Sequence, residues 1–204
     1  MASPSKQFIC QTPPAEIVRH FQSTPWALAL FSDPTLRPFT MESRIAKLTS
    51  TTDTFMARTL ATDDTIIAWQ AFHKISHPVP RASATSPPSS KAETVTVLKI
   101  GSGLNGHVDI CHGGVVSSIF DEVLGVAAIS ARPKDESIMT AYLKVDYKEP
   151  VRTPGVLLCR AWVEKSEGRK TLGRATMENG LGVVLATGEA LFVVVERDKV
   201  NGKL

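Results

Sequence analysis

The stretch GGVVSSIFDEVLGVAAISA, residues 113–131, decides the fold. It is long enough for one helix and is apolar on nearly every side, and a helix of that kind is buried all round. Four segments after it are rich in β-branched and aromatic residues and predict strands: 138–148, 155–165, 169–178 and 183–196. We therefore expect one central helix that is wrapped by a sheet.

The turns between these segments predict how the strands are connected. SEGR (166–169) and ENGLG (178–182) have the composition of hairpin turns. Strands joined by hairpins are antiparallel, which excludes a Rossmann sheet. The sequence thus predicts an α+β fold with an antiparallel sheet around one helix.

The first part of the chain predicts helices. Pro13-Pro14 precede a stretch in which Ile17, Val18 and Phe21 share one helical face. Further helices are expected at 26–31 and from Glu42 towards Leu60, before strands at 65–73 and 94–100. We therefore divide the chain into an N-terminal helical arm (1–60) and one domain (61–204). Within that domain, the Pro- and Ser-rich segment 77–93 is predicted to be a mobile loop between two strands.

Composition excludes several classes of protein. The chain has 204 residues, 43% hydrophobic and 21% charged, which fits a globular protein and excludes bulk disorder, collagen and coiled coil. A net charge of only +3 gives no basic footprint for nucleic acid. No apolar run reaches 18 residues, and the N-terminus lacks the order of a secretory signal, so we expect no membrane span and a cytoplasmic location. Cys10, Cys111 and Cys159 lie far apart, so no metal site is expected.

The segment GSGLNG (101–106) matches the GxGxxG phosphate-binding pattern. That pattern requires a helix that opens at the last glycine, within a βαβ unit. Six more residues separate Gly106 from the predicted helix, and no parallel crossover follows. We interpret the segment as a glycine-rich loop that leads to the helix.

The start of the central helix carries the candidate site. The first turn of a helix has unpaired N–H groups and positive dipole character, and Gly113 lets a ligand oxygen approach its N–H closely. Asp121 lies two turns further along, where a carboxylate is costly unless it is paired or used. Small and polar residues form one stripe on the helix and leave room for a ligand: Gly114, Ser117, Ser118, Asp121 and Gly125. Taken singly, His112 could merely cap the helix, and we expect a structural salt bridge for Glu122.

Three segments carry a resemblance to a known family: HGGVVSSIFDEVLG (112–125), MTAYLKVDYKEPV (139–151) and VEKSEGRK (163–170). They resemble the hotdog-fold acyl-CoA thioesterases, in the branch whose central helix begins with HGG. The resemblance implies a curved antiparallel sheet around a long helix, and hydrolysis of acyl thioesters without a metal or cofactor.

The resemblance also implies roles for single residues. Asp121 aligns with the catalytic carboxylate, Gly113 with the backbone donor to the thioester carbonyl, and His112 with the helix-start histidine. Thr140 aligns with the hydroxyl that helps to place the water. Some relatives have Asn six residues before the histidine; here that position is Gly106, and Asn105 stands next to it as a candidate substrate-binding residue.

Basic residues of the second half could meet the phosphates of CoA, although each could also be a solvated strand-edge charge. The candidates are Lys144, Lys148, Arg169 and Lys170.

The spacing of Gly113 and Asp121 predicts a shared site. Eight residues on one helix span about 12 Å, whereas a reacting carbon must lie about 3–3.5 Å from its nucleophile. If both residues act on one carbonyl, they come from different protomers, which agrees with the paired subunits that the resemblance implies. We therefore expect a homodimer or a dimer of dimers.

The sequence leaves the reaction partly open. The first hypothesis is an acyl-thioester hydrolase acting on acyl-CoA, with Asp121 as general base or as nucleophile. Release of a product from an acyl carrier, as in polyketide assembly, is a variant of it. The alternatives are a hotdog dehydratase or hydratase, and a non-catalytic acyl-binding protein, which would be favoured if Asp121 were paired and inaccessible.

Overall fold

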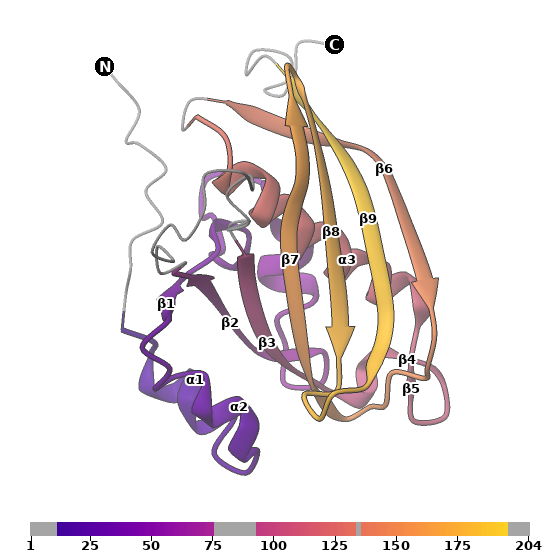
Figure 1. Cartoon of the computed structure of the whole chain (residues 1–204). Coiled ribbons are helices and arrows are strands. Elements are labelled where there is room, and N and C mark those ends of the chain that lie inside the picture. Colours follow the sequence, from indigo (N-terminus) through magenta and orange to yellow (C-terminus); the bar gives the residue numbers. More distant parts are fainter. Residues whose placement is uncertain (1–11, 76–92, 134–135, 196–204) are drawn as a thin grey trace, which may run out of the picture.

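The computed structural model describes residues 12–75, 93–133 and 136–195 (Figure 1). Seven antiparallel strands form one sheet in the order β1-β2-β3-β7-β8-β9-β6. Their bounds are β1 Leu36–Phe39, β2 Ile66–Lys74, β3 Glu93–Ile100, β6 Ser137–Tyr147, β7 Gly155–Glu167, β8 Lys170–Glu178 and β9 Val184–Val195. The predicted mobile loop lies outside the described residues, apart from Glu93, but β2 and β3 pair with each other as expected for strands on either side of it.

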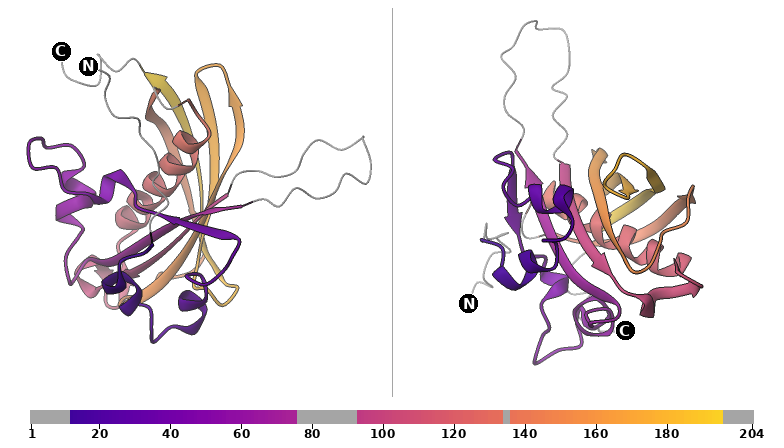
Figure 2. Two further views of the ribbon diagram at one scale, coloured as in Figure 1. Left: turned by 90° about the vertical axis from the view of Figure 1, so that its left-hand side faces the viewer. Right: turned by 90° about the horizontal axis from the view of Figure 1, so that it is seen from below.

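Helix α3, Gly113–Ser130, lies in the concave face of this sheet (Figures 1 and 2). Its buried side chains pack into the main core: Val116, Ile119, Phe120, Val123, Leu124, Ala127 and Ala128. The predicted α+β architecture, a curved antiparallel sheet around one central helix, is therefore confirmed. The prediction that the helix is buried on every side is wrong for one chain, because Gly114 is exposed and Ser118, Asp121 and Gly125 are half-buried.

Helix α3 is also long and apolar enough to cross a membrane by length and composition alone. Core helices of soluble proteins pass the same test, so this property is weak evidence for a span. Here the helix packs against strands β3, β6, β7, β8 and β9.

The N-terminal arm is only partly helical. Helices α1 (Ala15–Arg19) and α2 (Pro25–Ala29) form as expected and pack on the outer side of β2 and β3, with Phe21 and Phe72 in a second core. Residues 36–39, predicted to belong to the helical arm, instead form edge strand β1, which pairs with β2. Pro38 is compatible with this place because proline is confined largely to edge strands. The division of the chain at residue 60 stays a prediction.

The helix predicted from Glu42 to Leu60 is wrong. The segment holds only a 3₁₀ turn, η1 (Glu42–Arg44), and a π turn, η2 (Phe55–Thr59). The residues between them include LTSTTDT (48–54), and Ser, Thr and Asp side chains favour turns over helix interiors because they compete for backbone hydrogen bonds.

The GSGLNG segment forms no phosphate-binding βαβ unit. It contains a 3₁₀ turn, η3 (Ser102–Leu104), and then enters a small antiparallel pair, β4 (Asn105–His107) and β5 (Ile110–Cys111). The chain turns at Asp109, which has a φ of 56°. As predicted, the segment leads to the central helix, and the pair β4–β5 places His112 at the start of α3.

Candidate active site

The first turn of α3 leaves one backbone donor free. His112 caps the helix, since its Nδ1 accepts a hydrogen bond from the Gly114 N–H at 2.9 Å. The His112 carbonyl accepts from the N–H groups of Val115 and Val116. The Gly113 N–H has no hydrogen-bond partner within the described part of the chain. Of the first-turn donors, therefore, the Gly113 N–H is open to an incoming oxygen, whereas the Gly114 N–H is not while His112 caps it.

Tyr147 contacts the start of α3, a role that the sequence did not reveal. It lies at the end of edge strand β6, and its hydroxyl donates to the Gly113 carbonyl at 2.8 Å. The same hydroxyl lies 2.8 Å from Ser117 Oγ, which also donates to the Gly113 carbonyl. The only signal was the tyrosine of the YK-x-P segment, which by itself does not say which face of the strand it occupies.

Asp121 and Thr140 are brought together by α3 and β6. The Thr140 hydroxyl donates to Asp121 Oδ1 at 2.8 Å. Asp121 is half-buried and forms no ion pair with any described residue, and Oδ2 has no hydrogen-bond partner among them. A carboxylate that is oriented by one hydroxyl and keeps a free oxygen can accept a proton or attack a carbon.

Glu122, the next residue, has a different environment. It is held by the Ser43 hydroxyl, which donates to Glu122 Oε2 at 2.6 Å. Burial raises the pKa of Glu122, the Ser43 hydrogen bond opposes that shift, and the charge of Asp121 adds to it. The predicted salt bridge is wrong for the described residues: Arg44 acts on Glu122 only through its charge and donates to the carbonyls of Met56 and Ile66.

Other predicted binding residues are engaged within the protein. The Ser118 hydroxyl donates to the Gly114 carbonyl at 2.9 Å, one turn earlier in the same helix. Asn105 accepts a hydrogen bond from Thr153 through its side-chain oxygen. These contacts fix the helix start and the β4–β5 pair, and they leave Asn105 and Ser118 next to the site rather than aimed into it.

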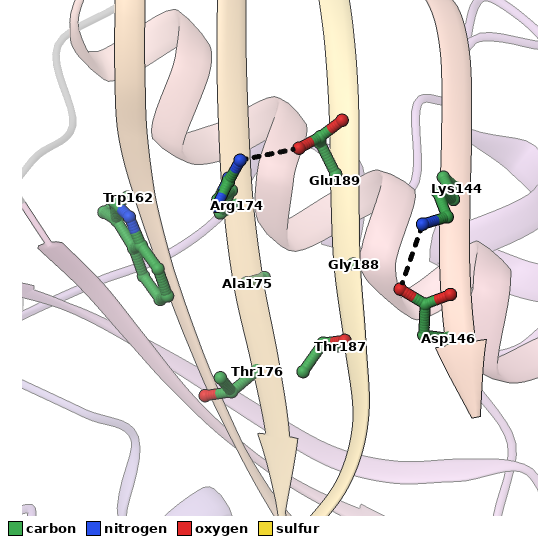
Figure 3. Close-up of a pocket in the computed structure, with 9 residues that line it drawn as sticks. All are labelled: Lys144, Asp146, Trp162, Arg174, Ala175, Thr176, Thr187, Gly188 and Glu189. Atoms are coloured by element: carbon green, nitrogen blue, oxygen red, sulfur yellow. Dashed lines mark ion pairs between the residues drawn. The ribbon is translucent and has the colours of Figure 1, made fainter. Parts of the chain in front are cut away.

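The predicted basic residues do not gather in one chain. Lys144 lies on the outer face of β6, opposite to Thr140 and Tyr147, because a bulge between Thr140 and Tyr142 reverses the alternation of the strand. There Lys144 pairs with Asp146 at 3.3 Å. It lines an open hollow of about 390 Å³ on the convex side of the sheet, with α3 behind it (Figure 3). Lys144 is therefore remote from Asp121 of its own chain.

Arg169 and Lys170 lie at the other end of the helix. Their hairpin is bonded to the end of α3 by Arg132, whose guanidinium donates to the Gly168 carbonyl at 2.8 Å. Arg169 itself donates to the Val194 carbonyl. Of the four predicted cations, only Lys148, next to Tyr147, lies at the Gly113 end within one chain.

Metal and thiol chemistry find little support in the described residues. No group of three or more His, Cys, Asp or Glu side chains among them could hold a metal ion. Cys111 and Cys159 are free and buried, and burial raises the pKa of the Cys111 thiol to about 11. A thiol with such a pKa is protonated at neutral pH and is a poor nucleophile.

Comparison with known protein families finds a match to the segment that holds this site. Residues 109–186, which hold α3, Thr140 and Tyr147, match the model of the thioesterase superfamily. This part of the chain is similar to the thioesterase superfamily. The resemblance predicted from the sequence is thereby confirmed.

Curated proteins that are similar to about half of the chain are also named as thioesterases. The chain is 33% identical over 113 residues to acyl-coenzyme A thioesterase THEM4 of Rattus norvegicus, covering 54% of this chain and 47% of the relative. It is 33% identical over 107 residues to the protein of that name from Xenopus laevis, covering 51% and 47%. The chain thus spans about half the length of the curated relatives it matches.

Solved structures with a similar arrangement include a Bacillus halodurans protein crystallised with CoA, at 22% identity and a TM-score of 0.47, covering 50% of this chain and 66% of that one. A thioesterase of Haemophilus influenzae has 12% identity and a TM-score of 0.49, covering 54% and 76%.

Proposed function

We propose that this protein hydrolyses acyl thioesters, with Asp121 as the catalytic carboxylate and the Gly113 N–H as the donor to the thioester carbonyl oxygen. The observation that carries this proposal is the Thr140–Asp121 hydrogen bond, which orients a half-buried carboxylate without neutralising it. A paired and inaccessible Asp121 would instead have favoured a non-catalytic acyl-binding protein.

Asp121 can act in either of two ways. As general base, it takes a proton from a water whose oxygen bonds to the carbonyl carbon; the C–S bond then breaks and the thiolate leaves with a proton. As nucleophile, its oxygen bonds to that carbon, the thiolate leaves, and water hydrolyses the resulting anhydride. In both routes the negative charge develops on the carbonyl oxygen, where the Gly113 N–H and the positive end of α3 stabilise it.

The reacting site is shared between two copies of the chain in this proposal. Gly113 and Asp121 of one helix are about 12 Å apart along its axis, too far to serve one carbonyl. Edge strand β6 supplies residues to both parts of the site, Thr140 beside Asp121 and Tyr147 beside Gly113. A partner helix that runs antiparallel to α3 would place its Gly113 near Asp121. We therefore propose a homodimer, alone or as a dimer of dimers.

Acyl-CoA is the proposed substrate, since the curated relatives are named for it. Lys148 is the cation placed to meet a phosphate near Gly113 of its own chain. Arg169 and Lys170 lie at the far end of α3, away from Gly113 of their own chain. They could therefore meet a CoA phosphate only at a different place in the proposed dimer. A carrier-bound acyl group presents the same thioester and the same pantetheine arm, so it is the alternative substrate.

The test is a hydrolysis screen that follows release of free thiol. Acyl-CoAs of increasing chain length and of aromatic character are compared with an acyl-carrier thioester, using the wild type and Asp121→Asn. We expect Asp121→Asn to lose on the order of 100-fold or more in kcat. Asp146→Asn, which alters an exposed carboxylate on the outer face of β6, is the matched control and should keep full activity. Retained hydrolysis by folded Asp121→Asn would remove the assignment.

A further inference from the structure

We propose that Tyr147 is a positioning residue that holds the Gly113 N–H in the direction required by the thioester carbonyl. The inference rests on the function proposed above, and it adds a residue for which neither the sequence pattern nor the relatives supplied a role.

Tyr147 contacts Gly113 in two ways. Its hydroxyl donates to the Gly113 carbonyl at 2.8 Å. Its ring lies beside the Gly113 Cα, because a Cβ added there would come within 3.4 Å of the phenol oxygen and 3.5 Å of Cζ. Both the polar and the aromatic part of the side chain therefore meet Gly113, whose N–H has no hydrogen-bond partner among the described residues.

Gly113 needs such support because of its own chemistry. Glycine lacks a Cβ and samples more backbone conformations than any other residue, and the first turn of a helix is where fraying begins. A donor stabilises a developing oxyanion best when it is already fixed before the reaction. On one side of Gly113, His112 is held by its N–H bond to the Leu104 carbonyl at 2.8 Å. On the other side, the Tyr147 hydroxyl holds the Gly113 carbonyl. The backbone is therefore held by a hydrogen bond on each side of the free N–H.

The contact is poorly suited to a purely structural role. The side chain of Tyr147 is 54% exposed, so it buries little apolar surface. The Gly113 carbonyl also accepts from Ser117 Oγ at 3.2 Å, and loss of the tyrosine hydroxyl would not leave it without a partner. Loss of that hydroxyl should therefore affect the geometry of the helix start more than the stability of the fold.

The same strand offers a matched control. Tyr142 is 43% exposed, and its hydroxyl donates to Glu189 Oε1 at 3.0 Å on the outer face of the sheet. Tyr142→Phe and Tyr147→Phe each remove one oxygen from one half-exposed tyrosine of β6. They differ in the face that the hydroxyl occupies, because the two tyrosines are an odd number of residues apart in the regular part of β6.

The experiment measures backbone motion and kinetics on the whole chain of 204 residues. The ¹⁵N order parameter of the Gly113 N–H should be about 0.85 in the wild type and in Tyr142→Phe, and should fall below about 0.7 in Tyr147→Phe. With a good acyl-CoA substrate, kcat of Tyr147→Phe should fall about 5-fold with KM within about 2-fold of the wild type, as expected when an interaction made in the transition state is weakened.

The outcomes separate this inference from the proposed function. An unchanged Gly113 order parameter in Tyr147→Phe, or an active wild type whose kcat survives that change, would overturn the positioning role. A wild type that hydrolyses no thioester would overturn the proposed function. The order parameter alone would then decide whether Tyr147 holds the Gly113 N–H in place. A fall in melting temperature without a selective change at Gly113 would identify Tyr147 as structural and would also overturn the inference.

Discussion

Thr140, on edge strand β6, donates its hydroxyl hydrogen to the Asp121 carboxylate of helix α3 at 2.8 Å. This bond fixes one carboxylate oxygen and leaves the other free. A carboxylate that had to find its orientation anew in each turnover would be a weaker base or nucleophile, since a misplacement of about 1 Å can cost on the order of 100-fold in rate.

The first prediction concerns this bond. Thr140→Val keeps the shape and the β propensity of the side chain and removes the donor. We expect kcat to fall about tenfold, the effect of losing one hydrogen bond to a charged group, with little change in melting temperature. Thr140→Ser should retain most of the activity. Thr187→Val, on the outer face of β9, is the control, and a fully active Thr140→Val would show that the bond does not orient the catalytic group.

Glu122 gives a prediction about pH. Burial raises its pKa in the folded protein above that of the unfolded chain. Between those two pKa values the folded state binds more protons, so stability falls as pH rises from the ordinary glutamate pKa through the folded one. The Gln side chain in Glu122→Gln carries no charge at any pH, so this variant should lose less stability than the wild type as the pH rises above the ordinary glutamate pKa.

Chemical unfolding at a series of pH values measures this difference. Glu167→Gln, at an exposed position on the β7–β8 hairpin, should follow the wild-type curve. A Glu122→Gln curve that also coincides with the wild type would mean that burial imposes no cost on this carboxyl.

His112 is predicted to act first as a helix cap. Its Nδ1 accepts the Gly114 N–H, and loss of an N-cap typically costs about 1 kcal/mol. His112→Ala should therefore lower the unfolding free energy by about that amount. His112→Asn, which can cap in the same way, should recover most of the loss. Equal stability of the alanine and asparagine variants, measured by urea unfolding, would argue against a capping role.

The fold was largely predictable because its strongest signals are local. An almost fully apolar helical stretch, followed by alternating segments and hairpin turns, leaves few arrangements that bury the helix. The position of Gly113 and Asp121 on that helix follows from the helical repeat alone. The helix prediction for Glu42 to Leu60 failed because the Ser and Thr residues of this segment weaken an otherwise helix-like pattern. The segment is also held by tertiary contacts, from Ser43 to Glu122 and from Arg44 to Met56.

The site was predictable only in part, and the bulge in β6 is the main reason. A strict alternation from Thr140 would turn Lys144 towards the helix and Tyr147 away from it. The extra residue between Thr140 and Tyr142 reverses both, so Tyr147 meets Gly113 and Lys144 faces outwards. No residue in MTAYLKVDYK marks such a bulge, because it depends on how β6 pairs with β9.

Complementation between two inactive variants tests the central claim, a thioesterase site shared between protomers, most directly. Asp121→Asn removes the carboxylate, and Gly113→Val blocks approach of the carbonyl. Each homodimer should be nearly inactive. After full subunit exchange at equal amounts, half of the dimers are mixed and each has one intact site of two, so about a quarter of the wild-type activity should return. Proven exchange without any recovered hydrolysis, or an active monomer, would contradict the account.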